Sequence, residues 1–288
     1  CAIPAGEARK NIKFLSVVYD ALSEFNMSRS DALVTLSGGV PGDLGGFAAA
    51  TYMRGIPFFQ IPTTILAQID SSVGGKVAVD LPSGKNLAGA FYQPKGVFID
   101  PDLLKTLPTR YVHDGLAEAV KYGCIGDREL FEIFESLETE EDLEKHIEEI
   151  ILHSVLQKTR VVEEDEFDTG KRQVLNFGHT IGHAVERYFH YSTFTHGEGV
   201  AIGMSLLTEQ TEKMGLTEKG TASRLIRVLH KLSLPTSIGV PAEDLIPQIM
   251  HDKKRRGKKI TLVVLKKIGE AELLTISTDE LSRYIVTE

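Results

Sequence analysis

Two histidines four residues apart, His179 and His183, stand in the segment 176–186, and His196 follows shortly after it. If the segment is helical, both side chains project from one helix face. Two imidazoles on one face can begin a metal site whose third ligand comes from elsewhere in the chain. The alternative is a helix with two polar histidines that bind nothing. These three histidines, of the nine in the chain, stand among glycines and close to Glu198, which favours a metal site.

A second candidate group is the pair Glu118 and Lys121, three residues apart on a predicted helix. On a protein surface such a pair contributes roughly 0.2–0.5 kcal/mol and needs no further explanation. The apolar neighbours of Glu118 indicate instead that it points inward, where a carboxylate needs a metal or a cation.

Glycine-rich and lysine-containing turns in the first half could hold phosphate. A strand at 31–36, a turn at 37–43 and a small-residue helix at 44–53 form an arrangement in which backbone N–H groups can approach the phosphate of a nucleotide. The spacing does not fit Gly-x-Gly-x-x-Gly, so a plain tight turn is the alternative to nucleotide binding. Lys76 and Lys85 stand in two further glycine-containing turns, which suit phosphate binding or are solvated loops.

The elements that must position these residues differ between the two halves of the chain. The first half has an α/β pattern, with a helix at 11–25 and further buried strands at 57–62 and 96–100. From Tyr111 onward helical patterns dominate. The predicted elements there are an acid-rich amphipathic helix at 132–149, a charged connection at 158–172, a basic run at 251–259 and a strand at 260–265.

Composition limits the possible partners. The net charge of −8 argues against nucleic acid, although local lysines can still form a pocket for an anionic small molecule. Cys1 and Cys124 are too few for a disulfide framework and favour a reducing, cytoplasmic setting. No apolar run approaches the roughly 18 residues that cross a bilayer, so we expect a soluble protein without a membrane partner.

Taken together and in order, several blocks resemble the 3-dehydroquinate synthase family of the sugar-phosphate cyclase superfamily. No single block decides the resemblance, which runs from Pro4 almost to the C-terminus. The blocks are 38–43, 51–55, 61–64, 70–76, 84–86, 89–94, 117–121 and 172–183.

The resemblance implies an enzyme that uses NAD catalytically together with a divalent metal, zinc or cobalt. Such an enzyme converts 3-deoxy-D-arabino-heptulosonate 7-phosphate to 3-dehydroquinate and phosphate in the shikimate pathway. The steps are alcohol oxidation, elimination of phosphate, re-reduction, ring opening and intramolecular aldol closure. The implied fold is a Rossmann-like α/β NAD-binding domain, here lacking its first strands, over residues 1–109. A mainly α-helical metal- and substrate-binding domain follows over residues 110–288.

By motif, the resemblance implies that Glu118, His179 and His196 bind the metal. One carboxylate and two imidazoles leave coordination positions open for substrate hydroxyls. His183 then becomes a proton acceptor beside the metal, a role that suits a neutral imidazole. Asp168 stands where the family has a second proton acceptor, commonly a glutamate.

Further matches are to residues that contact the substrate, and Lys121 is counted with the catalytic groups. Cations around the phosphate would stabilise the charge of the leaving group. The implied substrate contacts are Arg54, Asp70, Lys76, Asn86, Lys158, Arg172, Asn176, Lys253 and Lys254. Arg54 matches an arginine that reaches the neighbouring subunit's site, so the resemblance implies a homodimer.

The remaining matches are to NAD contacts. They are Glu7, Lys10, Gly38, Gly39, Val40, Asp43, Thr63, Thr64, Lys85, Leu103 and Thr106. Ser37 and Pro41 depart from the commonest form of the glycine turn. A hydroxyl still fits a tight turn, whereas Pro41 has no N–H to donate to a phosphate.

The family begins with several dozen residues that form the first strands of the NAD domain, and this chain starts at Cys1, near their end. We therefore expect a fragment of a longer protein or a truncated domain, with weakened NAD binding. The alternatives are another sugar-phosphate cyclase of the deoxy-inosose or valiolone type, and a non-catalytic remnant that acts as a binding or assembly partner. An iron-type polyol dehydrogenase is more remote.

Overall fold

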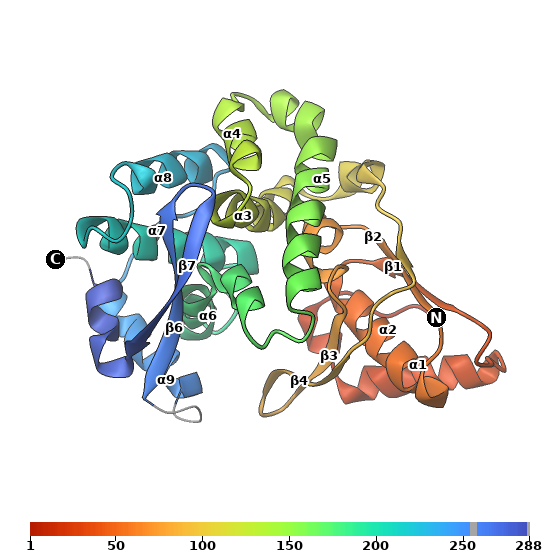
Figure 1. Cartoon of the computed structure of the whole chain (residues 1–288). Coiled ribbons are helices and arrows are strands. Elements are labelled where there is room, and N and C mark those ends of the chain that lie inside the picture. Colours follow the sequence, from red (N-terminus) through yellow and green to blue (C-terminus); the bar gives the residue numbers. More distant parts are fainter. Residues whose placement is uncertain (254–257, 287–288) are drawn as a thin grey trace. The chain divides into compact units, whose positions relative to one another are not determined.

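The computed structural model describes residues 1–253 and 258–286 (Figure 1). The chain divides into two compact units, Cys1–Val112 and His113–Glu288. The first unit is α/β and the second is mainly helical, which confirms the fold class expected from the sequence. None of the described helices combines the length and apolarity that a bilayer-spanning helix requires.

The first unit is built on a parallel sheet with the strand order β1-β2-β5. β1 (Leu33–Ser37) pairs along its whole length with β2 (Phe58–Pro62). The carboxyl ends of these strands therefore meet at one edge, where ligands of parallel sheets usually bind. β5 (Gly96–Val97) is shorter than the predicted strand 96–100.

α2 (Gly39–Thr51) connects β1 to β2 and begins inside the glycine turn, earlier than the predicted helix 44–53. Pro41 lies in its first turn, where a backbone without an N–H costs no helix hydrogen bond. The helix packs closely, since a Cβ added to Gly46 would lie 2.4 Å from Cγ1 of Val77. Small residues therefore allow α2 to approach its neighbours.

α1 (Ile12–Glu24) packs against α2 and completes the core of the first unit. The side chain of Asn11 caps the helix by accepting a hydrogen bond from the backbone N–H of Phe14 at 3.2 Å. Its apolar residues recur at helical spacing, as the sequence predicts. The buried core residues are Leu15, Val18, Leu22, Leu44, Ala48, Ala49, Ile56, Phe58, Val77 and Val79.

A β-hairpin stands where the sequence reading placed two loops, and that prediction is wrong. β3 (Lys76–Leu81) pairs antiparallel with β4 (Gly84–Phe91). Val77 and Val79 are buried and alternate with less buried residues. This alternation is the pattern of a half-buried strand, and the surrounding glycines and lysines hid it.

One face of the β1-β2-β5 sheet is apolar and exposed, although the sequence reading gave a buried first strand. Val34 is 55% and Leu36 65% exposed, because alternate residues of a strand face opposite sides. Phe98, 61% exposed, lies with its ring centroid 6.2 Å from that of Phe59. We call Val34, Leu36, Phe59 and Phe98 the exposed sheet face.

Helices make up most of the second unit, and α3 begins at the end of the first. Their bounds are α3 (Thr109–Ile125), α4 (Arg128–Ser136), α5 (Glu140–Glu164), α6 (His179–Tyr188), α7 (His196–Lys213), α8 (Thr221–Lys231) and α9 (Ile246–Lys253). The stretch 132–149, predicted as one helix, is divided between α4 and α5. Thr139 starts α5 with a capping box that includes Asp142, which explains the break.

A second hairpin lies near the C-terminus of the chain. β6 (Lys259–Lys267) contains the predicted strand 260–265, whereas its antiparallel partner β7 (Glu270–Ser277) was not predicted. β6 packs against α7, and the hairpin is drawn in blue in Figure 1.

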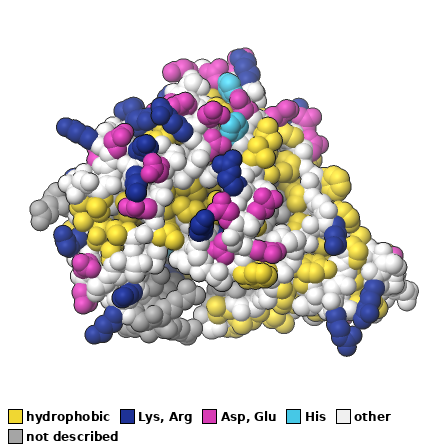
Figure 2. All heavy atoms as spheres, in the orientation of Figure 1, with side chains coloured by type: hydrophobic (Ala, Val, Ile, Leu, Met, Phe, Trp, Pro, Cys, Tyr) yellow, Lys and Arg dark blue, Asp and Glu magenta, His cyan; other side chains and the backbone are white. Residues whose placement is uncertain are grey.

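Charged side chains of both signs are interspersed on the face of the molecule in Figure 2. Many form short-range pairs, such as Arg128 Nε and Glu132 Oε1 at 2.7 Å. Exposed pairs of this kind contribute only about 0–1 kcal/mol each to stability. The charges suited to chemistry are buried ones, such as Glu118 and Lys121.

Candidate functional site

The candidate metal site draws one side chain from each of three helices of the second unit. Glu118 on α3 is fully buried, while His179 and His196 are the first residues of α6 and α7. Oε1 of Glu118 lies 3.2 Å from Nε2 of His179 and 3.2 Å from Nε2 of His196. Tetrahedral bonds of 2.0–2.2 Å separate ligand atoms by about 3.3 Å. One carboxylate and two imidazoles at this spacing fit a divalent ion such as zinc.

Glycines allow α6 and α7 to approach closely enough to bring the two histidines together. A Cβ on Gly203 of α7 would lie 2.0 Å from the carbonyl oxygen of Gly178. Gly178 itself has a left-handed backbone (φ 78°) that turns the chain into His179. The backbone contact therefore fixes where the first residue of α6 stands relative to α7.

Replacing Gly203 by Ala is expected to lower the free energy of unfolding by about 1–2 kcal/mol. Alanine gains about 1 kcal/mol in helix propensity, but the overlap with a backbone oxygen forces shifts at the upper end of the roughly 1–3 kcal/mol that overpacking costs. Urea denaturation that follows the unfolding of the second unit measures the difference in the free energy of unfolding between the variant and the wild type. An unchanged or raised midpoint would show that α6 can move away without cost.

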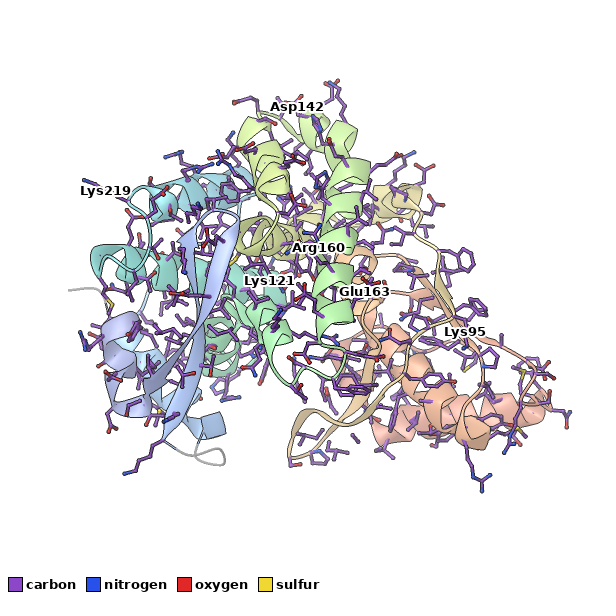
Figure 3. All side chains as sticks on the ribbon, viewed as in Figure 1. Lys95, Lys121, Asp142, Arg160, Glu163 and Lys219 are labelled. Carbon is purple, nitrogen blue, oxygen red and sulfur yellow. The ribbon has the colours of Figure 1, made fainter. Side chains whose placement is uncertain are left out.

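Glu118 is charged although it is buried. Burial favours its neutral form, but Lys121, His179 and His196 act in the opposite direction and hold the pKa of Glu118 well below its usual value. Lys121, labelled in Figure 3, is 2% exposed and forms an ion pair with Oε2 of Glu118 one turn away on α3. The inward orientation predicted for Glu118 is confirmed.

His196 has two carboxylate neighbours, Glu118 on one ring nitrogen and Glu186 on the other. Nδ1 of His196 lies 3.6 Å from Oε1 of Glu186. Burial lowers the pKa of His196, but the carboxylates of Glu118 and Glu186 outweigh this and raise the pKa to about 10. A metal that binds at Nε2 must therefore displace a proton, after which Glu186 can orient the imidazole through Nδ1.

The raised pKa of His196 predicts opposite pH dependences for the metal-free protein and for metal binding. A folded-state pKa of about 10 against about 6.5 in the unfolded chain adds stability below pH 6.5, and this stability is lost as pH rises toward 10. Metal affinity should increase over the same window, by up to about tenfold per pH unit.

Thermal unfolding and chelator-buffered zinc titrations between pH 6.5 and 9 test both dependences. The melting temperature of the metal-free protein should fall while the zinc dissociation constant also falls. A zinc affinity that does not change with pH would contradict protonation of His196 in the metal-free site.

His183 lies one turn after His179 on α6 and outside the Glu118 group. Its ring centroid is 5.4 Å from that of His179 and 6.0 Å from that of His196. His183, Glu186 and His196 form a second set of possible metal ligands. The Glu118 set presents a buried carboxylate to two imidazole nitrogens at 3.2 Å, which makes it the better candidate for a metal site, and His183 lies beside it.

Three predicted substrate residues of the second unit, Lys158, Arg172 and Asn176, stand on α5 and on the segment between α5 and α6. Lys158 and Arg172 are buried, at 6% and 2% exposure. Nη1 of Arg172 donates to the Glu166 carbonyl at 2.6 Å, and its backbone N–H donates to Asp165 Oδ2 at 3.0 Å. Backbone hydrogen bonds from Thr169 and Arg172 hold the pKa of Asp165 at about 2. This network orders the turn that precedes α6.

The other predicted residues here have distinct positions. Asp168 belongs to the same turn and has a left-handed backbone, with φ 55°. Asn176 ends the 3₁₀ segment Lys171–Asn176, just before α6. The side chain of Lys253 and the whole of Lys254 lie outside the described residues.

Two ion pairs join residues predicted to contact NAD in the first unit. Nζ of Lys10 lies 2.5 Å from Oδ2 of Asp43, and Nζ of Lys85 lies 3.6 Å from Oε1 of Glu7. Lys10 is buried, so its pair with Asp43 ties the segment before α1 to α2. The structure thus brings four residues from three separate parts of the sequence together.

The glycine turn lies against the end of β2. A Cβ on Gly38 would come 3.1 Å from Cγ2 of Thr64, and one on Gly39 would come 3.0 Å from Oγ of Ser71. The N–H of Thr63 donates to the carbonyl of Ser37 at 2.9 Å. The remaining predicted NAD residues are Val40 in the first turn of α2, and Leu103 and Thr106 in the 3₁₀ segment Pro101–Thr106.

The predicted substrate residues of the first unit are spread over several elements. Asp70 lies in the π-helical segment Ala67–Ser71, and Lys76 begins β3. Asn86 in β4 has φ 55°, and its N–H donates to Oδ1 of Asp80 at 2.7 Å. Arg54 is exposed and left-handed, with φ 68°.

Sequence reasoning missed two acidic residues that lie close to the Glu118 group. Glu186 stands seven residues after His179 on α6, a spacing that returns to the same helix face. Asp114 stands four residues before Glu118 on α3, again on the same face. Burial raises the pKa of Asp114. Helical spacing from the predicted ligands is the signal that could have found both.

Comparison with protein families covers nearly the whole chain. The family model described as 3-dehydroquinate synthase N-terminal matches residues 1–114, and the one described as 3-dehydroquinate synthase C-terminal matches residues 115–255. The chain belongs to the 3-dehydroquinate synthase family.

Relatives within the 3-dehydroquinate synthase family are close in sequence. The 3-dehydroquinate synthase of Clostridium acetobutylicum is 54% identical over 284 residues, which are 98% of this chain and 80% of the relative. That of Enterococcus faecalis is 49% identical over 288 residues, which are 100% of this chain and 80% of the relative. Identity at this level extends through both units.

Solved structures of other sugar-phosphate cyclases have the same fold at lower identity. A 2-epi-5-epi-valiolone synthase from Streptomyces hygroscopicus, with NAD⁺ and Zn²⁺ bound, has a TM-score of 0.89 at 28% identity. The match covers 98% of this chain and 80% of the chain of that synthase. A 2-deoxy-scyllo-inosose synthase with carbaglucose-6-phosphate, NAD⁺ and Co²⁺ has a TM-score of 0.84 at 28% identity. The match covers 98% of this chain and 82% of the chain of that synthase.

Proposed function

We propose that this protein is a 3-dehydroquinate synthase. It converts 3-deoxy-D-arabino-heptulosonate 7-phosphate to 3-dehydroquinate and phosphate, using NAD and a divalent metal. The observation that carries the proposal is the buried, charged Glu118 with His179 and His196 at 3.2 Å, in a chain about half identical to relatives of that name. Figure 3 shows where Lys121, the cation beside Glu118, lies in the second unit.

In this proposal the metal stands among Glu118, His179 and His196, and NAD is held by the first unit. The bound metal would act as a Lewis acid on a substrate alcohol, and NAD would accept and return a hydride. Lys121 keeps Glu118 ionised and therefore able to bind a cation. Glu186 holds the ring of His196 with Nε2 facing Glu118.

In this proposal His183 is the acid–base residue, which accepts and returns a proton beside the metal. His183 is exposed, so its imidazole can exchange protons with water. Asp168 is the second proposed proton acceptor. Lys158 and Arg172 offer buried positive charge to the substrate's anionic groups, with Lys76, Asn86, Asp70, Asn176, Lys253 and Lys254 as further contacts.

Release of phosphate from the heptulosonate phosphate, followed in the presence of NAD and zinc, tests this function. The expected result is one phosphate and one 3-dehydroquinate per substrate molecule. No phosphate at any enzyme concentration, from protein that binds zinc and NAD, would contradict the proposal. Phosphate from another sugar phosphate alone would favour the deoxy-inosose or valiolone type of cyclase.

We also propose a homodimer in which Arg54 enters the partner's site. Met53 and Arg54 both have left-handed backbones, with φ 50° and 68°, and such strain persists where a specific position is required. Mixing Arg54→Ala subunits with His183→Ala subunits should restore part of the activity. Additive residual activity of the two inactive variants would contradict a shared site.

A cytoplasmic location is proposed as well. Cys1 and Cys124 are both free cysteines, and disulfides are rare in a reducing compartment.

A further inference from the structure

Asp114 is a buried acid that the proposed chemistry does not use. It lies on α3 one helical turn before Glu118, and only 8% of its surface is exposed. Residues four apart on a helix stand one above the other on the same face. Asp114 and Glu118 therefore both face α7, whose first residue is His196.

The carboxylate of Asp114 binds the start of α7. Its Oδ1 accepts hydrogen bonds from the backbone N–H of Gly197 at 2.6 Å and from that of Glu198 at 3.2 Å. The first N–H groups of a helix have no partner within the helix, and a negative charge there is favoured by the helix dipole. A side chain of another helix thus caps α7.

The contact between the two backbones is equally close. A Cβ added to Gly197 would lie 1.8 Å from the carbonyl oxygen of Asp114, so only glycine fits at this position. Gly197 directly follows His196. The contact at Gly197 therefore sets the distance between α3 and the first turn of α7, directly beside the proposed metal ligand His196.

These contacts have a consequence for the metal site. We infer that Asp114 is a positioning residue for the metal: by clamping the first turn of α7 to α3, it sets Nε2 of His196 at 3.2 Å from Oε1 of Glu118. One turn of α3 then carries both a ligand and the anchor of a second ligand. The inference rests on the proposed metal centre and concerns metal binding rather than the cyclase reaction.

A cap that served only stability would behave differently from a positioning residue. Asp127 supplies the comparison, because it caps α4 by accepting a hydrogen bond from the N–H of Leu130 at 3.0 Å. Asp127→Ala should lower the melting temperature and leave the zinc dissociation constant within about twofold of the wild-type value. Asp114→Ala should raise that constant about 10–100-fold, the usual effect of losing a group that orients a ligand.

The experiment measures zinc affinity by chelator competition and records the visible absorption spectrum of the Co²⁺-substituted protein. Asp114→Ala should weaken zinc binding and shift the Co²⁺ bands, whereas Asp114→Asn should recover part of the affinity because its amide oxygen still accepts the two N–H bonds. Asp114→Glu keeps the charge but displaces the carboxylate, and should also weaken binding.

Wild-type zinc affinity and an unchanged Co²⁺ spectrum in folded Asp114→Ala would overturn the inference. If that variant does not fold, the same result in Asp114→Glu overturns it. Because the readout is metal binding, a wild-type protein that binds zinc but releases no phosphate from the heptulosonate phosphate would refute the proposed function and leave this inference standing.

Discussion

Replacement of His179 by Ala is expected to remove the metal and nearly all activity. His179 provides one of the nitrogens at 3.2 Å from Oε1 of Glu118, and two protein ligands rarely hold zinc against dilution. Loss of a Lewis acid removes several kcal/mol of transition-state stabilisation, so phosphate release should fall by roughly a thousandfold or more. Metal analysis after gel filtration should find much less than one zinc per chain.

A matched control for this variant is His146→Ala. His146 is an exposed histidine of the same unit that pairs with Glu149 on α5, with Nδ1 and Oε2 2.9 Å apart. It should retain full metal and activity. Stoichiometric zinc in His179→Ala would refute the assignment of His179 as a ligand and direct attention to the second set, His183, Glu186 and His196.

His183→Ala is expected to separate metal binding from turnover. His183 lies outside the Glu118 group, so zinc should remain bound at one per chain. Loss of a positioned proton acceptor typically costs 10²–10⁴-fold in rate, and kcat should fall within that range while the substrate KM changes little. The limb of the pH–rate profile that reports an imidazole should disappear.

Added imidazole offers a second measurement on the same variant. A small base that enters the exposed position of His183 should restore part of the lost rate. Loss of zinc from His183→Ala would contradict this division of roles, because it would make His183 a ligand.

The metal site shows what the sequence could and could not predict. His179 and His183 are neighbours in one helix, so their spacing was visible, and it suggested a pair of ligands. The structure instead groups His179 with Glu118 and His196. Glu118 and His196 stand 78 positions apart in the sequence. Only the packing of α3, α6 and α7 creates that group, and no local pattern encodes it. The family resemblance supplied these partners where spacing alone did not.

The fold was predicted unevenly for similar reasons. The elements with a strong apolar period, α1 and β2, were found close to their observed bounds. The β3–β4 hairpin was missed because its glycines and lysines resemble a loop, although Val77 and Val79 alternate as in a strand. Burial of β1 was overestimated because an apolar run does not tell which faces of a strand are covered.

The exposed sheet face affects how residues 1–288, taken alone, behave at high concentration. Val34, Leu36 and Phe98, each more than half exposed there, present apolar side chains to water. Exposed apolar patches promote association between copies. Sulfate and phosphate strengthen apolar burial, so buffers containing them should favour precipitation, and a phosphate-releasing assay is best run dilute and at low salt.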